Sequence, residues 1–325
     1  MKNTLTLSFS IFKANKGFSF GLLFLFFFGA TLIVMTTILP TTVTNSLDKF
    51  IDNCHMSQAT ILTEPMQTEV DGLKDVEGIK SVESQMIVDT NVKLSEDVLK
   101  QMRLFTIEDE GFREYYFNEK IDVEDNEKSI WVTWYFANAL DLHAGDMLEV
   151  KFPSGYENLK ISAIVSNPES SSCCYDDTFW SEDIDFGNIF MPRKDFNSLY
   201  HIEGLSNSRS FLFTDNLSIE KQDEAISKAK DLLGNKVKSS ELYERSKAKT
   251  ILDSNMASLT QACELFPYMI LAVMLICSGL FLYQTINNQR KKIGLLRALG
   301  YTSRKIVSIY ILYILVILLI ALPLG

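Results

Sequence analysis

The residue types that carry catalytic chemistry are few and scattered in this chain of 325 residues. Its three histidines, His55, His143 and His201, lie far apart in the sequence. Metal sites usually draw on closely spaced ligands, so we expect these histidines at the surface and predict no metal. The sequence has no G-x-x-x-x-G-K-[ST] phosphate loop, no H-E-x-x-H and no G-x-S-x-G. We therefore predict that the chain is not an enzyme and holds no cofactor.

The five cysteines and one acidic stretch are weaker candidates. Cys277 lies in an apolar run and is interpreted as a packing residue. Cys54 and Cys263 could pair, but we expect them at different heights on two helices, since a helix rises 1.5 Å per residue. Cys173 and Cys174 precede acids that could bind a cation, and a solvated acidic loop is the alternative we favour. Those acids are Asp176, Asp177, Glu182, Asp183 and Asp185.

The clearest pattern is the basic stretch QRKKIGLLRALGYTSRK at residues 289–305, which lies between two runs without any charge. It holds six cations and no acid. We predict a short helix over residues 290–299, followed by Gly300 as its C-terminal glycine. Ile293, Leu296 and Leu299 fall on one side of that helix, although Lys292 intrudes into the same face. Thr302 or Ser303 could cap the helix that follows.

Charge is strongly partitioned along the chain, whose net charge is −10. All 41 acidic residues lie between Asp48 and Glu264. The only charged residues in the parts 1–47 and 265–325 are Lys and Arg. Positive residues stay on the cytoplasmic side of membrane spans, so this partition predicts a membrane protein. The chargeless runs at residues 18–39, 266–286 and 306–325 have 22, 21 and 20 residues, which is enough to cross a bilayer.

These observations predict a topology. We expect a cytoplasmic N-terminus at 1–17, a first span at 18–43, an extracytoplasmic domain at 44–265, a second span at 266–286, a cytoplasmic segment at 287–305 and a third span at 306–325. The first run could instead be a cleaved signal peptide. We favour an uncleaved anchor, because the run is long and no A-x-A site follows it. We also expect the sequence to be a fragment that ends at or inside the third span.

The outer segment is predicted to be a mixed α+β domain. A helix over 218–234, with Ser218 as N-cap and Gly234 as its stop, lies between strands at 209–214 and 236–241 and forms a β-α-β unit. A short helix at 135–142, a turn at 143–146 and helices at 47–62 and 247–263 that extend the spans outward as a stalk are also expected. Further strands are predicted at 79–94, 130–133, 147–152, 161–167 and 188–196.

The stretch KKIGLLRALGYTSRKI resembles the motif that follows the second span in FtsX-like permeases, the MacB-type membrane subunits of ABC transporters. Ile293-Gly294, Arg297-Ala298, Gly300 and Thr302-Ser303 match that motif in order. The stretch WVTWYFANALDLHAGDMLEV is similar to the extracytoplasmic core of the same family. The sequence departs from the family at Lys292, where an acid is usual, and it lacks the fourth span and the second permease unit.

The resemblance implies that a separate cytoplasmic ATPase docks on the helix at 290–299 and that motion passes through the spans to the outer domain, for export or extraction of a substrate. The implied coupling residues are Arg290, Lys292, Ile293, Gly294, Leu296, Arg297, Ala298 and Gly300. Further implied partners are membrane lipid and either a second permease unit or a homodimer partner, and no nucleic acid is expected.

Three alternatives stay open at this point. The basic stretch could do no more than fix the topology or contact anionic lipid. The chain could be an FtsX-like signalling subunit that regulates an envelope enzyme, although the resemblance implies a smaller outer domain for such subunits. A membrane sensor with a cytoplasmic catalytic domain is disfavoured, because a third span follows the basic stretch directly.

Overall fold

The structure is a computed structural model that describes residues 11–12, 16–95, 98–124, 127–170, 174–176, 179–180, 186–321 and 323. Its internal contacts divide the chain into two compact units. A helical unit comprises Met1–Asn45 and Ser254–Gly325, and an α+β unit comprises Ser46–Asp253.

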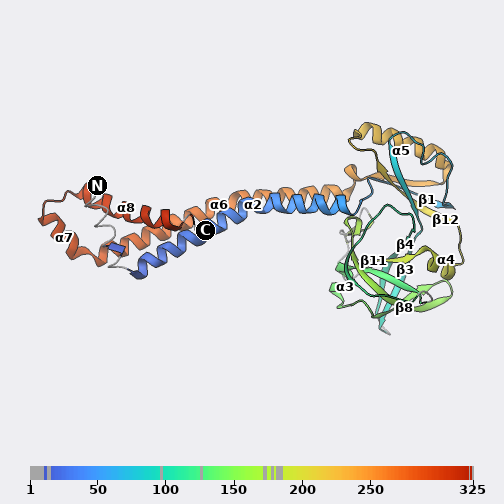
Figure 1. Cartoon of the computed structure of the whole chain (residues 1–325), viewed down its shortest axis with the longest axis horizontal. Coiled ribbons are helices and arrows are strands. Elements are labelled where there is room, and N and C mark those ends of the chain that lie inside the picture. Colours follow the sequence, from blue (N-terminus) through green and yellow to red (C-terminus); the bar gives the residue numbers. More distant parts are fainter. Residues whose placement is uncertain are drawn as a thin grey trace. The chain divides into compact units, whose positions relative to one another are not determined.

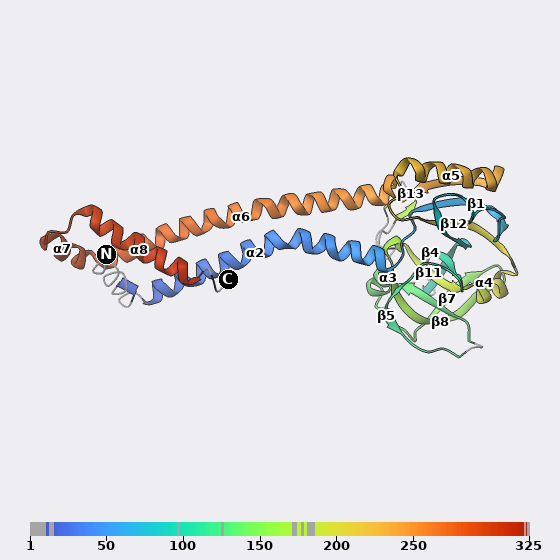
Figure 2. The same cartoon turned by 45° about the horizontal axis from the view of Figure 1, so that its top comes forward.

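The helical unit contains long apolar helices, which Figure 2 shows in blue and orange to red. Three helices of the described part of the chain are long and apolar enough to cross a membrane: α2, α6 and α8. Their shared core includes Leu22 and Phe26 of α2, Met274 of α6, and Ile309 and Ile317 of α8. The unit contains α7 (Arg290–Ala298), α8 (Ser303–Ala321) and most of α2 (Lys16–Asn53) and α6 (Lys247–Asn288).

One half of the α+β unit is a four-stranded sheet in the order β13-β1-β12-β2. The central strand β1 is antiparallel to both β12 and β13, so these two run parallel to each other, joined by α5 in a split β-α-β arrangement. Helix α5 covers one face of the sheet (Figure 1), where Ile61, Phe211 and Ala229 are fully buried. The elements are β1 (Ala59–Gln67), β2 (Ile79–Gln85), β12 (Leu205–Phe213), α5 (Ile219–Leu233) and β13 (Val237–Leu242).

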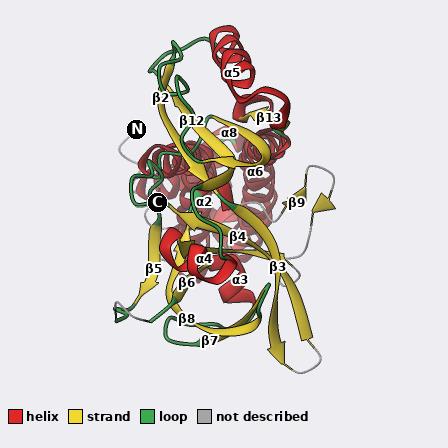
Figure 3. Cartoon of the chain, turned by 90° about the vertical axis from the view of Figure 1, so that its right-hand side faces the viewer, coloured by secondary structure: helices red, strands yellow, loops and turns green. Residues whose placement is uncertain are grey.

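The other half is a barrel inserted between β2 and β12 (Figure 3). Its seven-stranded sheet has the order β5-β8-β6-β11-β4-β3-β7, and β7 also pairs with β8, which closes a ring that leaves β5 outside. Alternate residues of each strand point inward, so Met102, Ile130, Val150 and Ile189 fill the interior. The strands are β3 (Ile87–Ser95), β4 (Val98–Ile107), β5 (Tyr116–Lys120), β6 (Ser129–Thr133), β7 (Met147–Phe152), β8 (Gly155–Ser166) and β11 (Phe186–Pro192).

Shorter elements complete the α+β unit. Helix α3 begins after Thr133, and helix α4 seals the barrel with Phe196, which is fully buried. A small two-stranded sheet pairs β9 with β10. These elements are α3 (Trp134–Ala139), η1 (Pro168–Ser170), β9 (Cys174–Asp176), β10 (Phe179–Trp180), α4 (Arg193–Tyr200), η2 (Gly234–Lys236) and η3 (Tyr243–Arg245).

The predicted fold class is confirmed: an α+β domain lies in the sequence between the first and second apolar helices. The predicted helix at 218–234 forms as α5, with Ser218 at its N-cap and Gly234, at φ 65°, at its C-cap. The strand at 147–152 forms with the predicted bounds. Helix α6 continues unbroken from Lys247 to Asn288, as expected for a span extended beyond the membrane.

Two predicted elements were wrong in part. The helix expected at 47–62 ends at Asn53, and β1 begins at Ala59 because residues 59–62 pair with β12 on one side and β13 on the other. The strand expected at 188–196 ends at Pro192, since proline has no N–H for a ladder. Residues from Arg193 onward form α4 instead.

Candidate functional site

The basic stretch folds as predicted into a short helix, α7, which spans Arg290–Ala298. It follows α6 after a single residue, Gln289, whose backbone is not helical. Gly300 has φ 85°, the left-handed conformation that glycine adopts without strain, and its N–H bonds to the Arg297 carbonyl at 3.0 Å. The carbonyl of Thr302 accepts the N–H of Ile306 at 3.2 Å, which places Thr302 at the start of α8.

The two sides of α7 differ from the predicted pattern. Ile293 and Leu296 are half-buried and pack against the apolar core of the helical unit. Leu295 and Leu299 are instead 63% and 68% exposed. The predicted face of Ile293, Leu296 and Leu299 is therefore split, because the first two residues attach α7 to the spans. The periodicity of the sequence indicates an apolar stripe on this helix. It does not indicate which apolar residues of the stripe pack against other helices of the same chain.

The remaining predicted coupling residues are exposed on α7 and its C-terminus. They are Arg290, Lys292, Gly294, Arg297, Ala298 and Gly300. A side chain added to Gly294 or Gly300 would meet no atom within 4 Å. The structure thus presents a cationic surface together with two bare leucines. That composition suits a protein partner that offers carboxylates and an apolar cleft.

Polar side chains hold α8 to its neighbours inside the helical unit. The hydroxyl of Tyr310 donates to Gln289 Oε1 at 3.2 Å, next to the start of α7. The hydroxyls of Tyr313 and Ser19 of α2 lie 2.8 Å apart. Both tyrosines and Ser19 are buried, and polar pairs of this kind join apolar helices with defined geometry. Sequence reasoning missed them, although polar residues within apolar runs are a recognisable signal.

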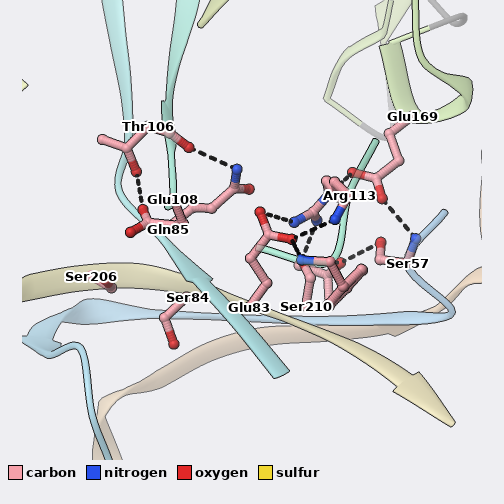
Figure 4. Close-up of polar contacts among 12 residues, drawn as sticks. Ser57, Glu83, Ser84, Gln85, Thr106, Glu108, Arg113, Glu169, Ser206 and Ser210 are labelled. Carbon is pink, nitrogen blue, oxygen red and sulfur yellow. Dashed lines mark hydrogen bonds and ion pairs between the residues drawn. The ribbon is translucent and has the colours of Figure 1, made fainter. Parts of the chain in front are cut away.

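A second polar cluster lies in the α+β unit, where the sheet meets the barrel (Figure 4). Arg113, on the loop between β4 and β5, contacts Glu83 of β2 at 3.1 Å and Glu169 of η1 at 2.8 Å. Its guanidinium also donates to Ser210 of β12. The side chains of Arg113 and Glu83 are only 5% and 3% exposed. Removing one partner of such a buried ion pair costs about 3–5 kcal/mol.

Electrostatics within this cluster favour the charged forms. Burial acts to raise the pKa of Glu169, but the charge of Arg113 and hydrogen bonds from Ser57 and Arg113 lower that pKa below its ordinary value. Burial opposes the charge on Arg113, and the two carboxylates raise its pKa all the same. Tyr115 beside them has a raised pKa because it is buried. The charges of Arg113 and Glu169 therefore stabilise each other.

Among the residues that the structure describes, the other sequence candidates do not assemble into a site. His143 lies 3.1 Å from Glu119, whereas His55 and His201 lie on other loops. No group of three His, Cys, Asp or Glu side chains suited to a metal occurs among the residues that the structure describes. Cys54, Cys263 and Cys277 are free thiols. Cys173 and the acids Asp177, Glu182, Asp183 and Asp185 lie outside the described residues, as do the side chains of Cys174 and Asp176.

Comparisons with known proteins bear on the C-terminal part of the chain. Residues 264–325, which include α7 and α8, match the family model of the FtsX-like permease C-terminal domain. No curated protein matches the chain.

Two of the solved structures that resemble the chain are distant in sequence. The extracellular domain of the noncanonic ABC-type transporter YknZ from Gram-positive bacteria is 11% identical, with a TM-score of 0.34, and the match covers 56% of this chain and 98% of that one. The periplasmic region of MacB from Actinobacillus actinomycetemcomitans is 10% identical, with a TM-score of 0.36, over 64% of this chain and 97% of that one. Both scores are below 0.5, so the assignment rests on residues 264–325. Through these residues the chain is similar to the FtsX-like permeases, and its three helices that are long and apolar enough to cross a membrane indicate a membrane protein.

Proposed function

We propose that the chain is the transmembrane permease subunit of an ABC transporter and passes the motion of a separate cytoplasmic ATPase to its extracytoplasmic domain, for export or extraction of a substrate. The family match of residues 264–325 is the observation that carries this proposal, because it includes the whole of α7. The sequence contains no phosphate-binding loop, so the ATPase is a partner chain.

Helix α7 is the proposed docking element. Its exposed Leu295 and Leu299 enter an apolar cleft of the ATPase, while Arg290, Lys292 and Arg297 face acidic groups around that cleft. Ile293 and Leu296 keep α7 attached to the spans, so a push on α7 moves α8 and the end of α6 with it. Membrane lipid and a second permease unit, or a second copy of this chain, complete the proposed assembly.

The orientation follows from charge. The basic residues Lys2, Lys13 and Lys16 and the cations of 290–305 are placed in the cytoplasm by the positive-inside rule. The acidic segment between Asp48 and Glu264 then lies outside. This puts α7 on the side of the membrane where ATP is available.

Docking is tested by truncating the exposed face of α7. Leu295→Ala combined with Leu299→Ala should weaken binding of the ATPase about 30-fold or more, since an interface hot spot contributes about 2 kcal/mol or more. The matched control is Leu315→Ala with Leu319→Ala, which removes two exposed leucines with the same spacing from α8. Binding is measured by titrating the purified ATPase onto the permease in nanodiscs. Equal affinity of the docking variant and the wild type would exclude this face of α7.

A further inference from the structure

The face of the sheet that does not carry α5 meets the barrel along a polar surface, which we call the seam. On the sheet side it consists of Glu83 and Gln85 of β2 and the row Ser206, Ser208 and Ser210 of β12, all buried. The alternate residues Phe211 and Phe213 of β12 face the α5 core instead. The sheet side of this contact consists of serines, a glutamine and a glutamate, so it contributes little apolar surface to the seam.

The chain crosses the seam at one end. The first crossing is Met86, between β2 and β3, and the second is the segment 201–204, between α4 and β12. Asn207 ties the two crossings together, since its side chain accepts the N–H of Ile87 and donates to the Ile87 carbonyl, each at 2.8 Å. His201 and Gly204 have φ of 55° and 66°, which marks a turn between the halves. This end of the seam is the natural hinge.

Arg193 of α4 lies beside the hinge. Its guanidinium donates to the Leu205 carbonyl at 2.9 Å and the Ser84 carbonyl at 3.1 Å, and it pairs with Glu108 at 2.6 Å. These bonds join the barrel to backbone groups of two strands of the sheet, β2 and β12. They fix the geometry of the hinge without closing the rest of the seam.

The far end of the seam is held by Arg113. Ser210, which Arg113 contacts, lies four residues beyond Ser206, about 13 Å along the strand. Glu83 of the sheet accepts bonds from the backbone N–H groups of Phe112 and Arg113 at 3.0 and 3.1 Å. Figure 4 shows Arg113 between Glu83 and Glu169. We call these three side chains the clamp.

The segment 54–58, which directly follows α2, is attached to both sides of the seam. The Ser57 N–H donates to Glu169 at 2.8 Å, and the Glu114 N–H donates to the Cys54 carbonyl at 3.1 Å. Gln58 bonds in turn to the backbone of Phe211 in β12, at 2.9 Å. A displacement of this segment therefore reaches the barrel through Glu169 and the sheet through β1.

Two pockets open to solvent lie along the seam. A cavity of about 580 Å³ is lined by residues 68–75 and Ser84 on the sheet side and by Glu108–Glu110 and Arg193 on the barrel side. A second cavity of about 230 Å³ is lined by Thr60 and Ser208 on one side and Phe105 and Glu169 on the other. The first pocket lies beside Arg193 at the hinge and the second beside Arg113 and Glu169 of the clamp, so contact between the two halves is incomplete at both places.

We propose that the sheet and the barrel open along this seam about the hinge, and that Glu169 is the positioning residue through which segment 54–58 keeps the clamp closed. The proposal deepens the proposed function, because it names the place where motion arriving through α2 changes the shape of the extracytoplasmic domain. Pulling Ser57 away from Glu169 removes one of the two restraints on that carboxylate and loosens Arg113.

The test is hydrogen exchange by mass spectrometry on the full chain in nanodiscs. Glu169→Gln removes one of the two carboxylate charges that hold Arg113, and Ser57→Pro removes the N–H and the hydroxyl that reach Glu169. Both variants should exchange the amides of 54–58 and 110–116 at least tenfold faster than the wild type. Amides of β4, β6 and α5 should keep their wild-type rates. The matched control is Glu127→Gln, which makes the same change in the exposed ion pair with Lys160 and should leave the clamp amides as they are.

The outcomes separate opening from unfolding. Unchanged exchange at 110–116 in Glu169→Gln would overturn the proposal, as would equal acceleration in β4, β6 and α5, which indicates general loosening. Should Ser57→Pro fail to fold, Glu169→Gln alone decides. No ATPase is present in this assay, so a negative result leaves docking on α7 untouched, and a failure of docking leaves the seam untouched.

Discussion

Two buried arginines in the α+β unit have different roles because their partners differ. Arg113 faces two carboxylates, and its charge is compensated where it lies. Arg209, which is fully buried, donates to Thr63 Oγ1 at 2.8 Å and to the Gln67 carbonyl at 2.7 Å. These acceptors flank the register shift of β1 between Leu62 and Met66, and burial lowers the pKa of Arg209. Arg209 thus stabilises a bulge within one sheet, whereas Arg113 joins two subdomains.

His143 and Glu119 form an exposed pair that should respond to pH. The pKa of His143 is raised by its hydrogen bond to Glu119 and by the charge of that carboxylate. The pKa of Glu119 is lowered by the N–H of Ala144 and by His143. The histidine contributes stability that is present below its ordinary pKa and lost as pH rises through its raised pKa. The carboxylate contributes stability that is present above its ordinary pKa and lost as pH falls through its lowered pKa.

The pair is therefore expected to stabilise the turn before β7 most between about pH 4.5 and 6.5. An NMR titration of the His143 ring should give a midpoint above the ordinary histidine value. Glu119→Gln should move that midpoint down, and Glu127→Gln, on another ion pair, should leave it in place. A midpoint that Glu119→Gln does not change would show that the pair does not form in solution.

At the scale of elements, close packing of α2 on α6 depends on small residues. A side chain on Gly29 would collide with Met274, and one on Gly21 would lie 3.1 Å from the ring of Phe281. Apolar helices in lipid gain no hydrophobic energy by association, so they rely on such close contact. The aromatic residues Phe20, Phe24 and Phe28 lie exposed on α2.

Gly29→Leu should accordingly destabilise the helical unit by about 1–3 kcal/mol, the usual cost of overpacking a tight contact. Gly279→Leu is the control, because an added side chain there meets no atom within 4 Å. Unfolding of both variants by SDS in mixed micelles, followed by circular dichroism, gives the comparison. Equal stability of the two would mean that α2 and α6 do not pack through Gly29.

At the scale of the whole molecule, charge separates the chain into a basic part and an acidic part. All 41 acidic side chains fall within a segment that the spans flank on both sides. The positive-inside rule applied to the Lys and Arg residues of the two flanking parts predicts one orientation, with both of these parts in the cytoplasm. The proposed docking of an ATPase on α7 requires that orientation.

This orientation in the membrane is tested by labelling single cysteines in intact cells. The cysteines are introduced into a variant from which the five native cysteines have been removed. A membrane-impermeant maleimide should label a cysteine at Lys228, an exposed position on α5. It should reach a cysteine at Thr302 only after the membrane is permeabilised. Labelling of Thr302 in intact cells would invert the topology and remove the basis for docking.

The sequence by itself determined the features that depend on local properties. Hydropathy located the three apolar helices, and a serine cap and a glycine stop located α5. Gly300 was predicted at the end of α7 because a left-handed residue there favours glycine. Each of these features is encoded by a few neighbouring residues, so no knowledge of distant contacts was needed.

Only the tertiary structure decided the features that depend on distant partners. Residues 59–62 form a strand because β12 and β13, far along the chain, bond to both edges. Leu296 is half-buried and Leu295 is exposed because the apolar core of the helical unit packs against one side of α7. Glu83, Arg113 and Glu169 meet because the barrel folds back onto the sheet. Strand pairing and ion pairing join residues at any separation, so no local pattern specifies which ones meet.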